Sequence, residues 1–82
     1  MSEPLRVSND RDLAHIVRTD DGNYYYVDNV SIGFGEYETM VFEANKAGDV
    51  ECWSGEYCER HTNYKATKER HNYIINHLEE VL

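Results

Sequence analysis

Side chains that could bind a metal ion are concentrated in the C-terminal half of the chain, namely Cys52, Cys58, His61 and His71. Structural zinc sites commonly take two ligands from a knuckle with roughly two to four residues between the cysteines, whereas five residues separate Cys52 from Cys58. Cys58 and His61 are closer in sequence, but on a regular strand their side chains point to opposite faces. The spacing favours two small buried thiols and an unrelated histidine over a metal site, and it predicts no cofactor.

His71 falls on the apolar side of a predicted helix, one turn before Ile74 and Ile75. A buried imidazole needs a hydrogen-bond partner for each ring nitrogen, and Tyr57, Cys58 or a strand carbonyl could provide one. The usual outcome of such a placement is a structural histidine. A catalytic role would need a second titratable group beside it, and the sequence places none there.

Motifs of nucleotide-binding proteins and hydrolases are missing from the sequence. It contains no Gly-x-x-x-x-Gly-Lys, no Gly-x-Ser-x-Gly and no His-Glu-x-x-His. The glycine-rich segment 32–35 is too short, and lacks the following helix, to hold a phosphate group. We therefore predict that the protein is not an enzyme. The alternative to a structural role is a small-ligand or metal-binding module that uses Cys58, His61 and His71.

The segment after residue 62 has the pattern of one amphipathic helix. Asn63 offers a side-chain acceptor to the first free amides of a helix, and no proline or glycine occurs from there to Leu82. Spacings of three and four residues make one stripe of Tyr64, Thr67, His71, Ile74, Ile75, Leu78, Val81 and Leu82. We predict a single helix to the end of the chain, about 28 Å long at roughly 1.5 Å per residue, with a sheet beneath its stripe.

Four segments rich in β-branched and aromatic residues are predicted to be strands: Leu13–Arg18, Tyr24–Val30, Tyr37–Glu43 and Val50–His61. Asp21-Gly22 supplies the positive φ angles of a two-residue turn, which would place His15 opposite Asp28 in the first hairpin. Residues 31–35 predict a bend or a crossing loop, and Gly55 predicts a bulge within its strand. Residues 40–42 (Met-Val-Phe) make the third strand apolar on both faces, so its second face also needs a cover.

These elements predict one domain of the α+β class over residues 1–82. We expect a four-stranded antiparallel sheet in the order β-β-β-β-α, with the C-terminal helix packed on one face. Residues 1–10 are predicted to be a loosely ordered lead-in, in which Leu5–Val7 is at most a short edge strand.

Negative charge is concentrated in the middle of the chain. The net charge is −8, and Thr19 to Glu59 carries ten acidic residues against Lys46 alone, which is −9. Such a body repels phosphate backbones and anionic lipid, so neither direct nucleic-acid binding nor membrane binding is expected. The N-terminus has no signal-peptide pattern and no segment is apolar enough to span a membrane, which predicts a cytoplasmic location with reduced cysteines.

Aromatic and acidic side chains define the predicted interface with a basic protein partner: Tyr24, Tyr25, Tyr26, Glu36, Glu38, Glu43 and Asp49. Three consecutive tyrosines must place at least one ring on each side of their strand, and tyrosine is enriched where proteins meet proteins. Two alternatives stay open. The rings could simply shield the second sheet face, or the chain could self-associate through that face or through an edge strand.

Three features follow one another in the second half of the chain: Tyr37-Glu38-Thr39-Met40-Val41-Phe42, then Trp53 with Tyr57-Cys58-Glu59-Arg60-His61, and then a helix that contains His71. In these features the chain resembles a group of small proteins encoded by phages, prophages and some bacteria. The resemblance covers residues 30–82 and implies a mobile-element context, hence the cytoplasm of a host cell. We therefore predict a non-enzymatic accessory protein that binds a host or phage protein. In its concrete form it is an acidic inhibitor that mimics nucleic-acid charge; the alternative is the module centred on His71 and Cys58.

Overall fold

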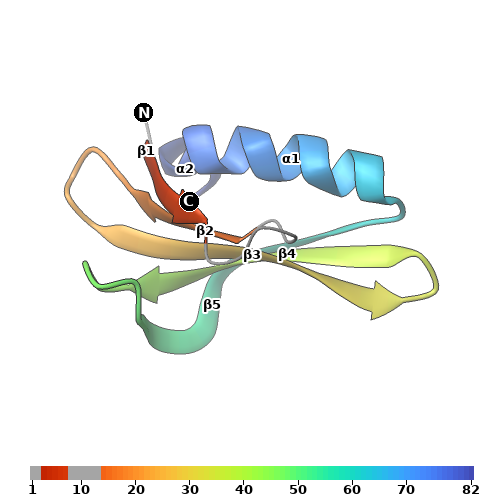
Figure 1. Cartoon of the computed structure of the whole chain (residues 1–82), viewed down its shortest axis with the longest axis horizontal. Coiled ribbons are helices and arrows are strands. Elements are labelled where there is room, and N and C mark those ends of the chain that lie inside the picture. The colour runs from red at the N-terminus through yellow and green to blue at the C-terminus, as the bar shows by residue number, and fades with distance from the viewer. Residues whose placement is uncertain (1–2, 8–13) are drawn as a thin grey trace.

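A twisted antiparallel sheet with helices over one face forms the protein (Figure 1). The computed structural model describes residues 3–7 and 14–82. Within them the elements are β1 (Glu3–Val7), β2 (Ala14–Arg18), β3 (Tyr24–Gly33), β4 (Glu36–Ala44), β5 (Val50–His61), α1 (Tyr64–Asn76) and α2 (Leu78–Val81). The strands lie in the sheet in chain order, and every neighbouring pair is antiparallel. The predicted α+β class, the antiparallel meander and the C-terminal helix on one face are confirmed.

The sheet has one strand more than predicted among the described residues, because β1 pairs with β2 at its edge. This strand contains the segment Leu5–Val7, for which the sequence allowed at most a short edge strand. The rest of the predicted lead-in, residues 1–2 and 8–10, lies outside the described residues, as does Leu13 at the predicted start of the next strand.

The predicted register of the first hairpin is wrong by one residue. His15 lies opposite Val27 rather than Asp28, and Ala14 lies opposite Asp28. The loop contains three residues instead of two: the Thr19 amide donates to the Asn23 carbonyl at 2.9 Å, and Gly22 takes the left-handed position with φ 88°. A turn followed by one left-handed glycine is the usual three-residue hairpin loop. A slip of one residue moves every side chain to the other face, so His15 turns toward the helices.

The apolar core lies between the sheet and the C-terminal part of the helical layer. It consists of Val17, Val27 and Val41 from three adjacent strands and Ile74, Ile75 and Leu78 from the helices. The predicted stripe supplies these helical side chains, whereas Tyr64 and Leu82 at its two ends are exposed. Burial of each such aliphatic side chain stabilises a fold by about 1.5–3 kcal/mol, so this cluster fixes α1 across β2, β3 and β4.

The predicted single helix is interrupted at His77. Asn63 caps α1 as expected, since its side chain accepts a hydrogen bond from the Ala66 amide at 2.8 Å. At the other end, the side-chain amide of Asn76 donates a hydrogen bond to the Asn72 carbonyl, and Nδ1 of the His77 ring donates one to the Tyr73 carbonyl. Polar side chains that bond backbone carbonyls one turn back compete with helix continuation, and they end α1 without a proline or glycine.

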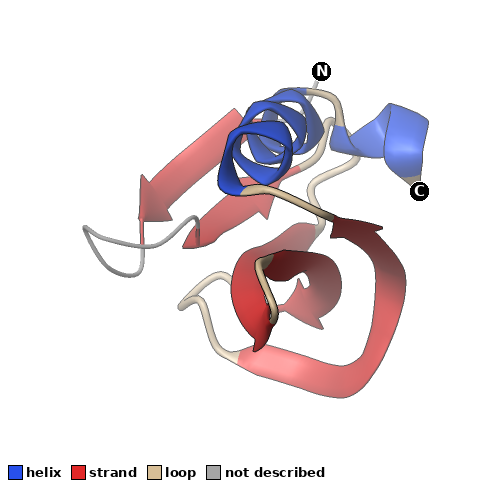
Figure 2. Cartoon of the chain, turned by 90° about the vertical axis from the view of Figure 1, so that its right-hand side faces the viewer, coloured by secondary structure: helices blue, strands red, loops and turns tan. Residues whose placement is uncertain are grey.

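The face of the sheet away from the helices is covered in part by the sheet itself. Figure 2 shows β5 sweeping through a wide arc before it leads into α1. The predicted bulge is present: Gly55 has φ 80°, and the β4–β5 register shifts between Val41 and Glu43. On this arc Trp53 lies over Phe42, with ring centroids 5.0 Å apart, and Tyr26 stacks on Phe42. The second apolar face of β4 therefore has an internal cover, although Trp53 itself is 69% exposed.

Candidate functional site

A row of polar side chains crosses the sheet beneath the N-terminal half of α1. Asn29, Thr39 and Glu59 lie opposite one another on β3, β4 and β5, and Thr67 and His71 face the sheet from α1. Thr39, Thr67 and His71 are fully buried. Buried polar groups require partners, so the hydrogen bonds of this row decide how α1 is held.

His71 is the centre of a directed hydrogen-bond chain. Its Nδ1 lies 2.5 Å from Asn29 Oδ1, its Nε2 lies 2.9 Å from His15 Nδ1, and the Asn29 amide donates to the Thr67 hydroxyl. Because Asn29 Oδ1 can only accept, His71 must carry its proton on Nδ1. His71 Nε2 is then an acceptor, and His15 must donate from Nδ1. The chain thus fixes both tautomers and leaves His15 Nε2 as a lone-pair nitrogen.

Both imidazoles of this chain are kept neutral by their surroundings. Burial, with a smaller contribution from the neighbouring His15, lowers the pKa of His71 from 6.5 to about 4. Burial also lowers the pKa of His15. A proton on His71 Nε2 would face the N–H of His15, so the first added proton belongs on His15 Nε2. The arrangement holds α1 against β2 and β3 as long as His71 stays neutral.

The partners of His71 differ from those that the sequence suggested. Tyr57 and Cys58 do not bond it; Asn29 and His15 do. His15 is the second titratable group that sequence reasoning did not place beside His71, because the predicted register set it opposite Asp28 instead of Val27. His71 is 0% exposed and both its nitrogens are engaged, which suits a structural role.

Glu59 organises a second polar cluster at the β5 edge of α1. It accepts hydrogen bonds from the Tyr57 hydroxyl, from His61 Nε2 at 2.7 Å and from Arg70 Nε at 3.0 Å. Burial raises the pKa of Glu59, but the bonds from Tyr57 and Arg70 outweigh it and the pKa is lowered. His61 also lines a shallow groove of about 320 Å³ with Arg70 and Tyr73. The carboxylate fixes the basic Arg70 on the sheet, so this cluster joins α1 to β5.

The two cysteines are free and exposed, which corrects the expectation of buried thiols. Cys58 lies opposite Met40, while His61 lies opposite Tyr37, so Cys58 and His61 occupy opposite faces as predicted. Burial and the neighbouring Glu38 raise the pKa of Cys58. Over residues 14–82 and β1, no group of three or more His, Cys, Asp or Glu side chains could hold a metal ion. Cys58 and His71 are not brought together.

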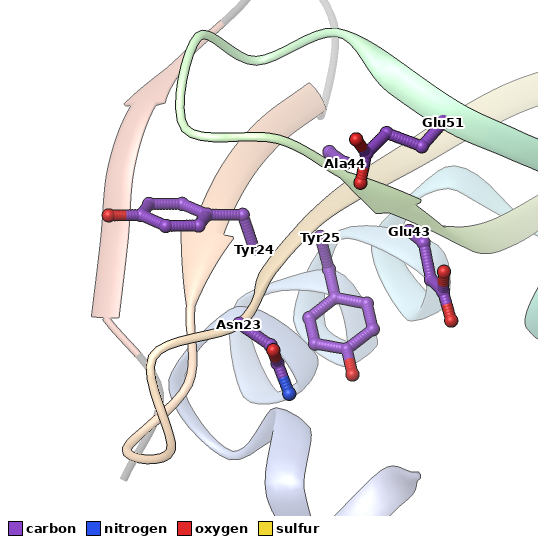
Figure 3. A pocket seen from close by; sticks show the side chains of 6 residues that line it. All are labelled: Asn23, Tyr24, Tyr25, Glu43, Ala44 and Glu51. Atoms are coloured by element: carbon purple, nitrogen blue, oxygen red, sulfur yellow. The ribbon is translucent and has the colours of Figure 1, made fainter.

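Carboxylates crowd around Tyr25 at one end of the sheet. Tyr25 and Glu43 are cross-strand neighbours, and Figure 3 shows their side chains pointing the same way. The Glu56 side chain hydrogen-bonds Glu43, and this bond raises the pKa of Glu56. Burial, together with the charges of Asp21, Glu43 and Glu56, raises the pKa of Tyr25. We call Tyr25, Glu43, Glu51 and Glu56 the acidic end of the protein.

A hollow of about 140 Å³ opens at the acidic end (Figure 3). It is lined by Asn23, Tyr24, Tyr25, Glu43, Ala44 and Glu51. Two carboxyl groups in contact, like those of Glu43 and Glu56, repel each other once both are ionised. A cation placed between them would remove that repulsion, so the acidic end is suited chemically to a lysine or arginine side chain.

The structure brings together only part of the predicted interface. Tyr24, Tyr25 and Glu43 line the hollow, whereas Tyr26 stacks on Phe42. Tyr25 packs against the core on the helix side of the sheet and Tyr26 stacks on Phe42 on the other side, so the tyrosines place rings on both faces, as expected. The remaining predicted residues lie elsewhere: Glu38 pairs with Arg60 at 3.1 Å, Glu36 starts β4 at the far end of the sheet, and Asp49 lies in the β4–β5 turn.

Sequence reasoning missed Glu51 and Glu56. Both are exposed side chains of β5. Glu56 lies in the register shift between the partners of Val41 and Glu43, and Glu51 lies in the shift between the partners of Glu43 and Ala44. Gly55 was the available signal, since a glycine bulge changes the direction of neighbouring side chains.

No protein-family model, curated protein or solved structure matches the chain. Among the described helices, none is long and apolar enough to cross a membrane.

Proposed function

We propose that this is a non-enzymatic protein that binds a basic partner protein through its acidic end. The observation that carries the proposal is the hollow lined by Tyr25, Glu43 and Glu51, in which Tyr25 and Glu43 lie directly opposite each other on β3 and β4. Neighbouring carboxylates repel each other in the free protein at neutral pH, which lowers its stability. A cationic side chain of a partner would be attracted to both carboxylates and would remove this repulsion. Perturbed titratable groups of this kind favour a functional surface.

A mimic of nucleic-acid charge is the concrete form of this function. The acidic body would occupy the basic cleft of a host or phage nucleic-acid-binding protein, in keeping with the mobile-element context that the resemblance implies. Electrostatic binding of this kind weakens steeply with salt. Duplex DNA that binds the same cleft should then displace the protein from its partner, whereas a partner that binds both together would contradict the mimicry.

The alternative of a small-ligand module centred on His71 and Cys58 has less support. Both nitrogens of His71 are already bonded, and Cys58 lies on the other face of the sheet from Glu59 and His61. Native mass spectrometry of protein purified without chelator would detect a bound ligand or metal and revive this alternative.

Charge-neutralising variants test the proposed function. Wild-type protein is immobilised, proteins from a bacterial lysate are applied, and the fraction eluted by a salt gradient is purified as the candidate partner. Its dissociation constant is then measured for E43Q/E56Q and for E69Q/E80Q, which removes the same charge from exposed helical positions. We expect about tenfold weaker binding or more for E43Q/E56Q alone. Equal affinities of the two double variants would rule out the acidic end as the binding surface.

A further inference from the structure

The turn between β3 and β4 combines full exposure of a large apolar side chain with an unfavourable backbone. Phe34 is fully exposed, and its φ of 54° lies in the left-handed region. Among the described residues, Phe34 is the one non-glycine residue with a positive φ. Left-handed backbone is costly for a bulky residue and is normally left to glycine or asparagine. Strained residues of this kind concentrate at functional positions.

The residues that flank Phe34 are glycines, which have no side chain to pack against its ring. Gly33 and Gly35 flank it with φ values of 97° and 75°, and a Cβ built on either would meet nothing within 4 Å. The β3–β4 register shifts between Ser31 and Gly33, which leaves Ile32 as an extra residue in β3. Bulges of this type bend a strand and redirect its side chains. The turn thus holds an aromatic ring at the outermost point of the hairpin.

Apolar exposure extends from the turn into β3. Val30 is 40% and Ile32 is 39% exposed, so three exposed apolar residues follow at every second position. Figure 1 shows this turn at the opposite end of the sheet from the β4–β5 turn. Scattered apolar residues are normal on a surface, but a fully exposed phenylalanine in left-handed backbone, with two further exposed apolar residues just before it in the chain, is typical of a contact surface.

We propose that the β3–β4 turn is a docking prong, in which Phe34 inserts into an apolar pocket on a basic partner protein. We define the docking prong as Val30, Ile32 and Phe34. The turn is followed by Glu36, and the segment 28–38 contains no lysine or arginine, although Arg60 of β5 pairs with Glu38. This charge disfavours an anionic lipid surface and a second copy of the same acidic turn, and it favours a pocket with a basic rim. The inference rests on the proposed function for the basic character of the partner.

Phe34 variants separate docking from folding. Asparagine tolerates left-handed backbone, so F34N should unfold at the same or a higher urea concentration than wild type. The same change should weaken binding of the salt-eluted partner by about 30-fold, the factor expected for losing one buried phenylalanine side chain. F34W, which keeps a large apolar ring, and L82N, which changes an exposed apolar residue at the C-terminus, should each bind within about twofold of wild type.

Each outcome decides between explanations. Wild-type affinity of F34N for the partner overturns the docking prong, and a lower unfolding midpoint of F34N shows that Phe34 packs within its own chain. Phe34-dependent binding to phosphatidylglycerol vesicles assigns the turn to a membrane, and Phe34-dependent dimerisation in sedimentation assigns it to a second copy; both contradict the proposal. If E43Q/E56Q weakens binding and F34N does not, the proposed function stands and this inference falls. A wild-type column that retains no protein refutes both.

Discussion

Acid should weaken the fold through His71. The pKa of His71 is about 4 in the folded protein, against 6.5 for an ordinary histidine. Between these two pH values His71 is therefore protonated in the unfolded chain and neutral in the folded chain. A group that binds more protons when unfolded destabilises the fold as pH falls. Its effect is absent above pH 6.5, grows as pH falls toward 4, and is constant below. The difference between a pKa of 6.5 and one of about 4 corresponds to about 3 kcal/mol in full, and to about 2 kcal/mol between pH 7 and pH 5.

The variant H71Q isolates this contribution. A carboxamide offers one donor for Asn29 Oδ1 and one acceptor for His15 Nδ1–H, so it preserves the bonds of the chain without a titratable ring. Urea unfolding is followed by circular dichroism at pH 7 and pH 5 for wild type, H71Q and H77Q. H77Q serves as the matched control because His77 is partly exposed outside the row. Each variant is compared with itself, so that altered packing cancels.

Wild type and H77Q should lose about 2 kcal/mol more of their free energy of unfolding between pH 7 and pH 5 than H71Q does. Carboxylates titrate in all three proteins and drop out of the comparison. The reasoning would be refuted by equal losses in all three, or by an NMR titration in which the His71 ring changes charge near pH 6.5.

Two further substitutions, each at a single polar side chain, are tested by urea unfolding. N63A removes the cap that accepts from the Ala66 amide and should cost about 1 kcal/mol, whereas N63S should retain most of the stability; an N63A variant as stable as wild type would show that the cap contributes nothing. T39V removes a hydroxyl that is fully buried and has no hydrogen-bond partner in the described part of the chain, so it should stabilise the protein by about 1 kcal/mol. A less stable T39V would reveal a partner for that hydroxyl.

Local patterns in the sequence were sufficient for β2 to β5, for α1 and for their order, but not for β1 or for the interruption of the helix at His77. Alternating β-branched and aromatic residues defined β2 to β5, and the stripe through Thr67 and Ile74 defined the buried face of α1. The Asn63 cap and the Gly55 bulge followed from backbone requirements that few residue types satisfy. These features depend on neighbours in the chain and can be predicted without knowledge of the fold.

The contacts between distant residues were decided by the tertiary structure. A hairpin loop of three residues instead of two turned His15 toward α1, where it meets His71, 56 positions away. The bulge in β5 brought Glu56 to Glu43 and laid Trp53 over Phe42, giving the second face of β4 an internal cover. The sequence determined that a buried histidine and an acidic body exist, because residue type and periodicity suffice for that. Their partners depended on register and strand curvature, where a shift of one residue exchanges the two faces of a strand.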